Sequence, residues 1–348
     1  MEEVQRELGL ECVVKLASNE GPFGPFPAAV EALERGIAEL NRYPDGGAYR
    51  LRSALAERHG VRFEEIALGA GADGVIDLIS QATLDPGDEV VCGWPSFPSY
   101  VIDALKMGAE VERVPLREHR YDLEAMLAAI GPRTKLAYIC HPNNPTGTMN
   151  ARAELDEWFE QVPEHVLTVL DQAYFEYNDD PGYADGIEEY AKTGRRVAVL
   201  RTFSKIYGLA GLRVGYGVMS EELAAATGKV RRAFDISHLA QVAALASLGD
   251  DEEIARRRRL NREGLVELEH ALRSHGLDPV TPSYANFLYV EVGEDSRPLF
   301  EQLLGEGVIV RPLAGFGSPG AIRVTCGTPE ENAYCAEAFG RVLAQTAS

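Results

Sequence analysis

The stretch IALGAGADGVIDL (Ile66–Leu78) runs from a short apolar segment through Gly69, Gly71 and Gly74 into a helical pattern. The spacing Gly-x-Gly-x-x-Gly occurs in dinucleotide-binding folds, which place an acidic residue for the ribose at the end of the next strand. The next strand here, within DEVVCGWPSF (88–97), is followed by Gly-Trp-Pro instead. A helix that begins at a glycine loop still favours a bound anion through its free N–H groups and its dipole. We therefore expect a phosphate at this loop, and not a nicotinamide or flavin dinucleotide.

On either side of this loop, short β-branched runs alternate with amphipathic helical segments from about residue 60 to residue 220. Such alternation is typical of a mostly parallel sheet with helices on both faces. Seven strands are expected, at Ile66–Leu68, Glu89–Cys92, Glu110–Val114, Lys135–Cys140, Val166–Leu170, Val197–Arg201 and Val214–Met219. The sequence thus predicts an α/β fold with a seven-stranded sheet sandwiched by helices.

The pattern changes near Gly249, where a long charged helix is followed by the apolar runs YANFLYVEV, GVIVRPL and GAIRVTCGT and by a last helix. This order predicts a smaller α+β domain. We expect an N-terminal arm over residues 1–28 that joins the small domain, a large domain with the binding site over residues 29–248, and the small domain over residues 249–348. In the long helix, acidic neighbours of Arg256–Arg259 predict a solvent-exposed, ion-paired face.

Composition excludes several classes of function. The chain has 348 residues, of which 45% are apolar and 25% charged, as in an ordinary globular protein. Its net charge of −20 argues against a nucleic-acid partner. Five scattered cysteines without C-x-x-C indicate reduced thiols, and seven histidines show no metal-ligand spacing. There is no signal-peptide pattern and no apolar run near the ~20 residues of a membrane span. We expect a cytoplasmic protein that binds no metal, membrane or nucleic acid.

Polar residues follow two of the predicted strands. In YICHPNNPTGT the pair Asn143 and Asn144 comes after an apolar strand, and in VLTVLDQAYFEY Asp171 and Tyr174 follow another. Turn formation and helix capping are the alternative explanations for these residue types. Ligands of open α/β sheets bind at the carboxyl ends of the strands, and a carboxylate behind a buried strand is costly unless it is paired. We therefore favour ligand recognition.

A third strand is followed by the segment RTFSKIYGLAGLRVGYG, which gathers Thr202, Ser204, Lys205 and Arg213 among glycines. Most lysines are surface residues, but two hydroxyls and an arginine beside this one are typical of a phosphate site with an amine nucleophile. The acid, tyrosine, asparagine and lysine together match the needs of pyridoxal phosphate (PLP). Its aldehyde requires a lysine, its ring nitrogen an acid, and its phosphate a glycine loop and an arginine.

The chain resembles the fold-type I PLP-dependent aminotransferases, and most closely the histidinol-phosphate aminotransferase family. The resemblance covers nearly the whole chain through KLASNEGPFGP, NRYPDGGAYRLRSALA, LDPGDEVVCGWPSFPSY, HPNNPTGT, RTFSKIYGLAGLRVGYG, GVIVRPL and IRVTCGTPEEN, in that order. It implies that Lys205 forms the internal aldimine with PLP, that Asp171 pairs with the ring nitrogen, and that Tyr174 and Asn144 hold the phenolic oxygen. Phe97 takes the place of the aromatic residue that stacks on the ring, although core packing is the commoner role of a phenylalanine.

The resemblance also implies how the cofactor phosphate is bound. The groups that would hold it are the backbone amides of Ala72 and Asp73 and the side chains of Thr202, Ser204 and Arg213. Tyr43 would reach the phosphate of the neighbouring subunit, which implies a homodimer with shared active sites. A simple turn before Pro44 is the alternative explanation of this tyrosine.

The implied substrate residues are Arg323, Arg311, Asn19 and Asn144, with a structural ion pair as the alternative for Arg323. The implied reaction is reversible, ping-pong amino transfer between L-histidinol phosphate and 2-oxoglutarate in histidine biosynthesis, with Lys205 as the base. The products are imidazole-acetol phosphate and L-glutamate.

Several positions depart from the family pattern. Gln172 replaces a glutamate, Gly21 replaces an asparagine, and Phe234–His238 differ from the usual segment. Relatives also carry a substrate-contacting tyrosine upstream of the point where this sequence begins. These departures leave a phenylalanine or tyrosine aminotransferase and a threonine-phosphate decarboxylase as alternatives. A non-catalytic PLP-binding protein or regulator, and a dehydrogenase supported only by the glycine loop, are more distant ones.

Overall fold

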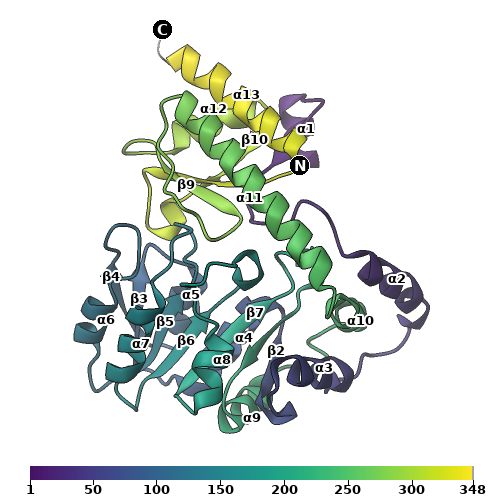
Figure 1. Ribbon diagram of the computed structural model, residues 1–348, viewed down its shortest axis with the longest axis vertical. Helices are drawn as coiled ribbons and strands as arrows, with labels where there is room; N and C mark the ends of the chain where they lie inside the picture. Colours follow the sequence, from purple (N-terminus) through teal and green to yellow (C-terminus); the bar gives the residue numbers. More distant parts are fainter. Residues whose placement is uncertain (347–348) are drawn as a thin grey trace.

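The computed structural model describes residues 1–346, and Figure 1 shows a large body below and a small body above that contains both ends of the chain. The seven predicted strands all form, in the order β2-β8-β7-β6-β5-β3-β4. Their bounds are β2 Ile66–Gly69, β3 Glu89–Trp94, β4 Glu110–Pro115, β5 Thr134–Cys140, β6 Leu167–Asp171, β7 Val197–Thr202 and β8 Gly215–Val218. Only β8 runs in the direction opposite to the other six strands, so the predicted mostly parallel sheet is confirmed.

Helices cover both faces of this sheet. Crossovers between parallel strands are right-handed. The path from β3 outward to β4 through α5 (Ser99–Lys106) and the return to β5 through α6 (Leu123–Ala129) therefore place these helices on opposite faces. The contacts agree, because α4 (Gly71–Thr83) packs with α5, whereas α6 packs with α7 (Arg152–Gln161). Since α4 follows directly on β2, its first turn lies at the carboxyl edge of the parallel strands.

The other helices of the large body surround this sandwich. They are α2 Pro27–Gly36, α3 Tyr49–His59, α8 Gly186–Glu189, α9 Glu221–Val230 and α10 His238–Ser247, with the short 3₁₀ segments η1 Ile37–Glu39, η2 Phe63–Glu65, η3 Phe175–Tyr177, η4 Ala191–Thr193 and η5 Ala210–Leu212. α2 packs on α10 at one side of the large body (Figure 1). No helix within residues 1–346 combines the length and the apolar character that crossing a membrane requires.

The small body contains two short sheets. β9 (Phe287–Glu291) and β11 (Arg311–Pro312) flank β12 (Ala321–Thr325) in an antiparallel sheet, and β1 (Val14–Lys15) pairs in parallel with β10 (Val308–Ile309). The helices that accompany them are α1 Glu2–Leu8, α11 Asp251–Ser274, α12 Arg297–Gly305, α13 Pro329–Thr346 and the 3₁₀ segment η6 Ala314–Phe316. α11 runs from this body down to α10 in the large body (Figure 1).

Each body has its own apolar core. The larger core lies between the seven-stranded sheet and its helices and includes Phe26, whereas Val14 and Leu16 pack in the core of the small body. The N-terminal segment therefore contributes to both cores. On this basis we propose the division into an arm over residues 1–28, a large domain over residues 29–248 and a small domain over residues 249–348.

The prediction of a solvent-exposed face for Arg256–Arg259 is wrong at Arg257. This side chain is buried, and its Nη1 donates to the carbonyl oxygens of Gly24 (2.6 Å) and Ile206 (3.0 Å) while its Nε pairs with Glu253. Helical periodicity could not reveal this, because both carbonyls come from segments remote in sequence. The arginine anchors α11 to the N-terminal arm and to the loop after β7.

Candidate active site

The carboxyl ends of several neighbouring strands meet at one cavity of about 110 Å³. The strand registers explain why, since Cys140 on β5 lies beside Asp171 on β6, and Thr202 on β7 lies beside Gly215 on β8. The cavity is lined by Ala72, Asp73, Phe97, Cys140, Asn144, Asp171, Ala173, Tyr174, Thr202, Ser204, Lys205 and Arg213. All of these except Cys140 and Ala173 are residues that the sequence predicts for the site.

Lys205 lies in the turn that follows β7, with its Nζ 5.5 Å from the centroid of the Tyr174 ring. Burial and the positive charge of Arg323 lower the pKa of this amine to about 8, because both disfavour the charged form. A lysine with that pKa is half unprotonated at pH 8, where an ordinary lysine is almost entirely charged. It can therefore act as a nucleophile and as a base.

The N-terminal arm passes very close to this lysine. A Cβ on Gly21 would lie 2.6 Å from the carbonyl oxygen of Lys205, a separation that real Cβ atoms do not reach. The departure from the family pattern at Gly21 thus has a steric reason in this chain.

Asp171 ends β6 and is buried in the wall of the cavity. Its Oδ2 accepts a hydrogen bond from the Tyr100 hydroxyl (2.7 Å), and its Oδ1 accepts one from the backbone N–H of Ala173 (3.0 Å). Burial raises the pKa of this carboxyl, and the two hydrogen bonds pull it down. The bond to Ala173 is the local contact expected of a capping aspartate. The bond from Tyr100 comes from another helix, and local capping does not account for it.

The first turn of α4 forms an anion-binding end of the cavity. Its N-cap residue, Ala70, has no side chain that could cap the turn, so the N–H groups around Ala72 and Asp73 are available to a ligand. Arg213 lies against this turn, where its Nη2 donates to the Ala70 carbonyl (3.1 Å) and its Nη1 to Ser204 Oγ (3.4 Å). These groups would suit a phosphate.

Glycines allow this close approach. Gly71 has a φ of +82°, and a Cβ there would lie 2.7 Å from Arg213 Nη2. Gly215, at the start of β8, faces the same turn, and a Cβ there would lie 2.5 Å from the carbonyl carbon of Gly71. The positive φ at Gly71 and the backbone contact at Gly215 both require that the side chain be absent.

We expect Gly215→Ala to lower the free energy of unfolding by about 1–3 kcal/mol, the usual range for overpacking a filled site. The added methyl group must push the first turn of α4 away from β8. Gly211→Ala is the matched control, because no heavy atom lies within 4 Å of its Cβ position. Urea unfolding of both variants tests this, and equal stabilities would contradict the steric account.

The N-terminal arm and β12 complete the site from the other side. Asn19, which has a φ of +55°, donates from Nδ2 to the Tyr174 hydroxyl (2.8 Å). Arg323 on β12 donates from Nη1 to Asn144 Oδ1 and from Nη2 to the Ala17 carbonyl (2.8 Å). Four predicted site residues thus belong to hydrogen-bonded pairs beside the cavity.

Arg323 has a further donor that no protein group uses. Its Nε is buried without a hydrogen-bond partner among the described residues, and burial lowers the pKa of the guanidinium to about 10, with Arg311 contributing. Arg311 lies opposite Arg323 in the β11–β12 register, and its Nε donates to the same Ala17 carbonyl (3.3 Å). Leaving a buried donor unpaired costs about 1–3 kcal/mol. An anion that accepts from Arg323 would remove this cost.

Asn19, Arg311 and Arg323 do not line this cavity, and neither does Tyr43. Its side chain is 81% exposed and stacks on Phe234 with ring centroids 4.5 Å apart. Arg231 holds the same loop by donating to the Gly46 carbonyl (2.7 Å). Within one chain, Tyr43 is therefore presented to the outside rather than to Lys205.

Sequence reasoning missed Tyr100, Cys140 and Ala173. Tyr100 comes three residues after Phe97 in SFPSY, a spacing that brings side chains to one face of a helix, but it also fits a core residue. Cys140 is the last residue of β5 and has Asp171 as its register partner, so the strand ends alone could have indicated it.

The departure at Gln172 lies outside the cavity lining. Its Oε1 accepts from the backbone N–H of Gly186 (3.1 Å) and from Arg201 Nη2 (3.2 Å), and its Nε2 donates to the Ala184 carbonyl (2.8 Å). All its polar atoms are thus used in the protein interior, and a change there does not remove a group that lines the cavity.

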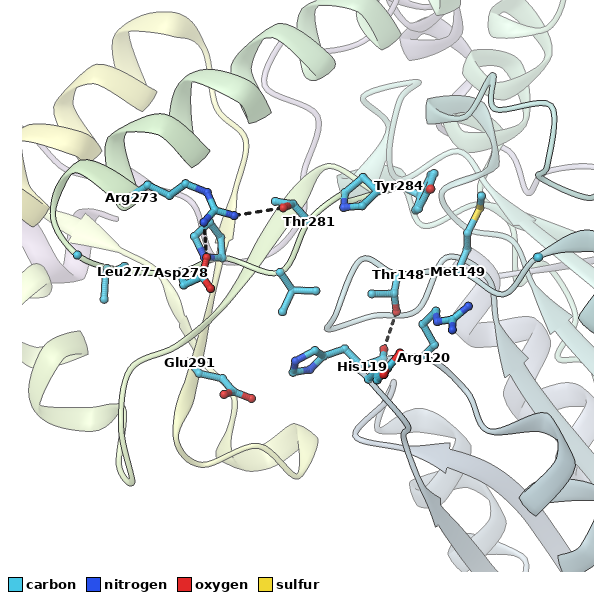
Figure 2. A pocket seen from close by; sticks show the side chains of 16 residues that line it. His119, Arg120, Thr148, Met149, Arg273, Leu277, Asp278, Thr281, Tyr284 and Glu291 are labelled. Carbon is cyan, nitrogen blue, oxygen red and sulfur yellow. Dashed lines mark hydrogen bonds and ion pairs between the residues drawn. The ribbon is translucent and has the colours of Figure 1, made fainter.

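A larger cavity, of about 860 Å³, opens between the two bodies. Figure 2 shows His119, Arg120 and Thr148 of the large body on one side and Arg273 and Glu291 of the small body on the other. None of its lining residues also lines the cavity around Lys205. Figure 2 also shows that Thr148 donates to the His119 carbonyl (2.6 Å). The smaller cavity, with a lysine of lowered pKa and a buried acid, is the better candidate for catalysis.

Comparison with known proteins agrees with this assignment. The sequence profile of the family described as "Aminotransferase class I and II" matches residues 11–339. Histidinol-phosphate aminotransferase of Moorella thermoacetica is 46% identical over 345 residues, which cover 99% of this chain and 89% of the relative. Histidinol-phosphate aminotransferase of Akkermansia muciniphila is 47% identical over 346 residues, with coverage of 99% and 94%.

Solved structures give the same result. Histidinol-phosphate aminotransferase from Sinorhizobium meliloti, in complex with pyridoxal-5'-phosphate, matches with a TM-score of 0.92 at 29% identity over 99% of this chain and 94% of that one. An aspartate aminotransferase mutant from Thermus thermophilus matches with a TM-score of 0.86 at 27% identity over 98% and 94%. These likenesses confirm the predicted fold type I. The chain belongs to the class I and II aminotransferase family.

Proposed function

We propose that this protein is a PLP-dependent aminotransferase that moves the amino group between L-histidinol phosphate and 2-oxoglutarate. The observation that carries the proposal is that Lys205, with its lowered pKa, shares one cavity with the buried acid Asp171. The choice of histidinol phosphate rests on the full-length relatives that bear this substrate in their names.

The residues of the cavity fit PLP. When bound, PLP supplies an aldehyde that condenses with amines and a ring that withdraws electrons from the reacting carbon. The uncapped first turn of α4 and Arg213 would hold its phosphate, and the Asp171 carboxylate would pair with its ring nitrogen. Tyr174 and Asn144 would hold its phenolic oxygen, and Phe97 would cover the ring.

The side chains of the site have separate tasks. Lys205 Nζ takes up and returns the proton of the reacting substrate carbon, which requires its unprotonated form. The two hydrogen bonds to the Asp171 carboxylate oppose the rise of its pKa that burial causes, and the ionised form that they favour would favour positive charge next to it. Asn19 fixes the Tyr174 hydroxyl, whose pKa burial raises, so that this hydroxyl remains a donor.

One anion site must accept a phosphate from one substrate and a carboxylate from the other. Arg323 suits both because its planar fork offers parallel N–H groups and its Nε is unpaired among residues 1–346. Arg311 adds a second positive charge that faces the same carbonyl of the arm.

We also propose a homodimer with shared active sites. The exposed apolar side chains Val30, Ile37, Leu40, Tyr43 and Phe234 lie near one another in sequence or in a stacked pair, and large exposed aromatic groups favour protein contacts. Tyr43 would there reach the cofactor phosphate of the other subunit. Sedimentation should give about twice the chain mass of 38.0 kDa.

The rate at which the cofactor-free protein captures PLP should rise with pH up to about 8 and then level off. Capture would require the unprotonated form of Lys205. Burial lowers the pKa of this amine to about 8, so the rate of capture should fall about tenfold per pH unit below that value. Stopped-flow absorbance between pH 6 and 10 measures this rate. The control is the amino acid lysine in solution with its α-amino group blocked. A rate that continues to rise toward pH 10, as for the free amine, would contradict the assignment.

Steady-state kinetics with alternative amino donors test the substrate. Histidinol phosphate should give the highest kcat/KM, and removal of its phosphate should cost at least about a hundredfold, because a buried guanidinium loses a charged partner. A preference for phenylalanine or tyrosine would instead assign the protein to the aromatic aminotransferases. Release of carbon dioxide from a phosphorylated amino acid would indicate a decarboxylase.

A further inference from the structure

Tyr100 lies directly behind the acid of the proposed cofactor site. It is the second residue of α5, is fully buried, and packs edge-on against Phe97 with ring centroids 5.7 Å apart. One short segment thus supplies both an aromatic wall of the cavity and a hydroxyl group behind Asp171.

The Tyr100 hydroxyl is one of two donors that fix the Asp171 carboxylate. It donates to Oδ2 (2.7 Å), and the Ala173 N–H donates to Oδ1 (3.0 Å), so each carboxylate oxygen has one donor. A hydrogen bond from a hydroxyl to a carboxylate is strong because one partner carries charge. Two bonds on different oxygens also fix the plane of the carboxylate.

The donor does not titrate over the useful pH range. Burial raises the pKa of the Tyr100 phenol well above its ordinary value, and the neighbouring Asp171 charge raises it further. The phenol therefore keeps its proton and can donate whether the solution is neutral or mildly alkaline.

The Tyr100 ring is held in place from its other side. It stacks on Tyr138 of β5 with ring centroids 4.5 Å apart and planes 9° apart. The Tyr138 hydroxyl in turn shares a hydrogen bond with Ser80 Oγ (3.1 Å) on α4, the helix whose first turn would hold the phosphate.

We propose that Tyr100 is a positioning residue that keeps the Asp171 carboxylate ionised and correctly oriented for a protonated pyridine nitrogen. The inference rests on the proposed function. The alternative is a purely structural role, in which Asp171 only accepts the hydrogen bond of a buried tyrosine hydroxyl. Loss of that hydroxyl would then lower the stability, but it would cause no pH-dependent change in cofactor binding.

The dissociation constant of PLP, measured by equilibrium dialysis at several pH values, tests the proposal in Tyr100→Phe. We expect weaker binding by roughly tenfold at neutral pH, the range for losing a hydrogen bond to a charged group. The deficit relative to the unchanged protein should grow as the pH is lowered. Without the donor, Asp171 takes up a proton more readily, and its neutral form no longer favours the charged ring.

Tyr138→Phe is the matched control, because it removes a buried hydroxyl that contacts Ser80 and not Asp171. It should change the dissociation constant by less than about twofold at every pH, because loss of a hydrogen bond between two uncharged groups costs little free energy. Equal effects of both variants, or a deficit of Tyr100→Phe that is constant with pH, would overturn the proposal. Failure of the unchanged protein to bind PLP would instead refute the proposed function.

A double variant separates the proposed coupling from general damage. In the background of Asp171→Asn, the further change Tyr100→Phe should have almost no additional effect on the dissociation constant, because the charge that the hydroxyl supports is already gone. Should Tyr100→Phe alone fail to fold, the double variant should fold, since it no longer buries an underpaired carboxylate. A double variant as unfolded as the single one would contradict the proposal.

Discussion

Lys205→Ala should reduce transamination by at least about a thousandfold, within the range that a positioned proton-transfer group contributes. The change removes the only amine that lines the cavity in the described part of the chain. In the roles proposed for Lys205, the substrate carbon would then lose its base and the cofactor its covalent attachment. Steady-state kinetics with histidinol phosphate and 2-oxoglutarate measure this effect.

Two controls make this result specific. Lys192→Ala removes a lysine that pairs with Glu188 and does not line the cavity, and it should leave the rate within about twofold, as is usual for an exposed ion pair. Added small amines should restore part of the activity of Lys205→Ala, and the more basic ones should restore more. A loss of less than tenfold would mean that another group is the base.

Asp171→Asn should lower kcat by about a hundredfold to a thousandfold, the range for removal of one preorganised electrostatic group. The amide keeps the shape of the carboxylate but cannot hold a positive charge on the ring nitrogen. Asp103→Asn is the control. Asp103, which lies on α5, is buried as Asp171 is, but it pairs with Lys106 and does not line the cavity. It should leave kcat nearly unchanged.

The variant Asp171→Asn should not destabilise the cofactor-free protein. Burial raises the pKa of Asp171, which means that the ionised carboxylate is costly to bury. Its replacement by a neutral amide removes that cost, so the free energy of unfolding in urea should be unchanged or higher. Lower stability together with lower activity would indicate a structural role for Asp171 instead.

Much of the fold could be predicted because its signals are local. Each of the seven strands is a short β-branched run between helical patterns, and the residues that follow these runs must meet at one edge of a parallel sheet. Lys205, Asp171, Asn144 and Tyr174 could therefore be placed together without any knowledge of side-chain geometry.

Other features depend on contacts between distant segments and had no local signal. Tyr100 and Asp171 are separated by 71 positions, and Arg257 and Gly24 by 233. Helical periodicity predicts which face of a helix is buried and which is exposed. It does not predict which group, remote in sequence, will form a hydrogen bond with Tyr100 or Arg257. Tyr43 is different again, because its proposed partner is a second copy of the chain.

Borohydride reduction of the purified protein, followed by proteolysis and mass spectrometry, tests the central assignment most directly. The peptide that contains Lys205 should carry the mass of reduced pyridoxal phosphate, and prior incubation with histidinol phosphate should abolish this label. A label on a different lysine, or a protein that takes up no pyridoxal phosphate, would contradict the account.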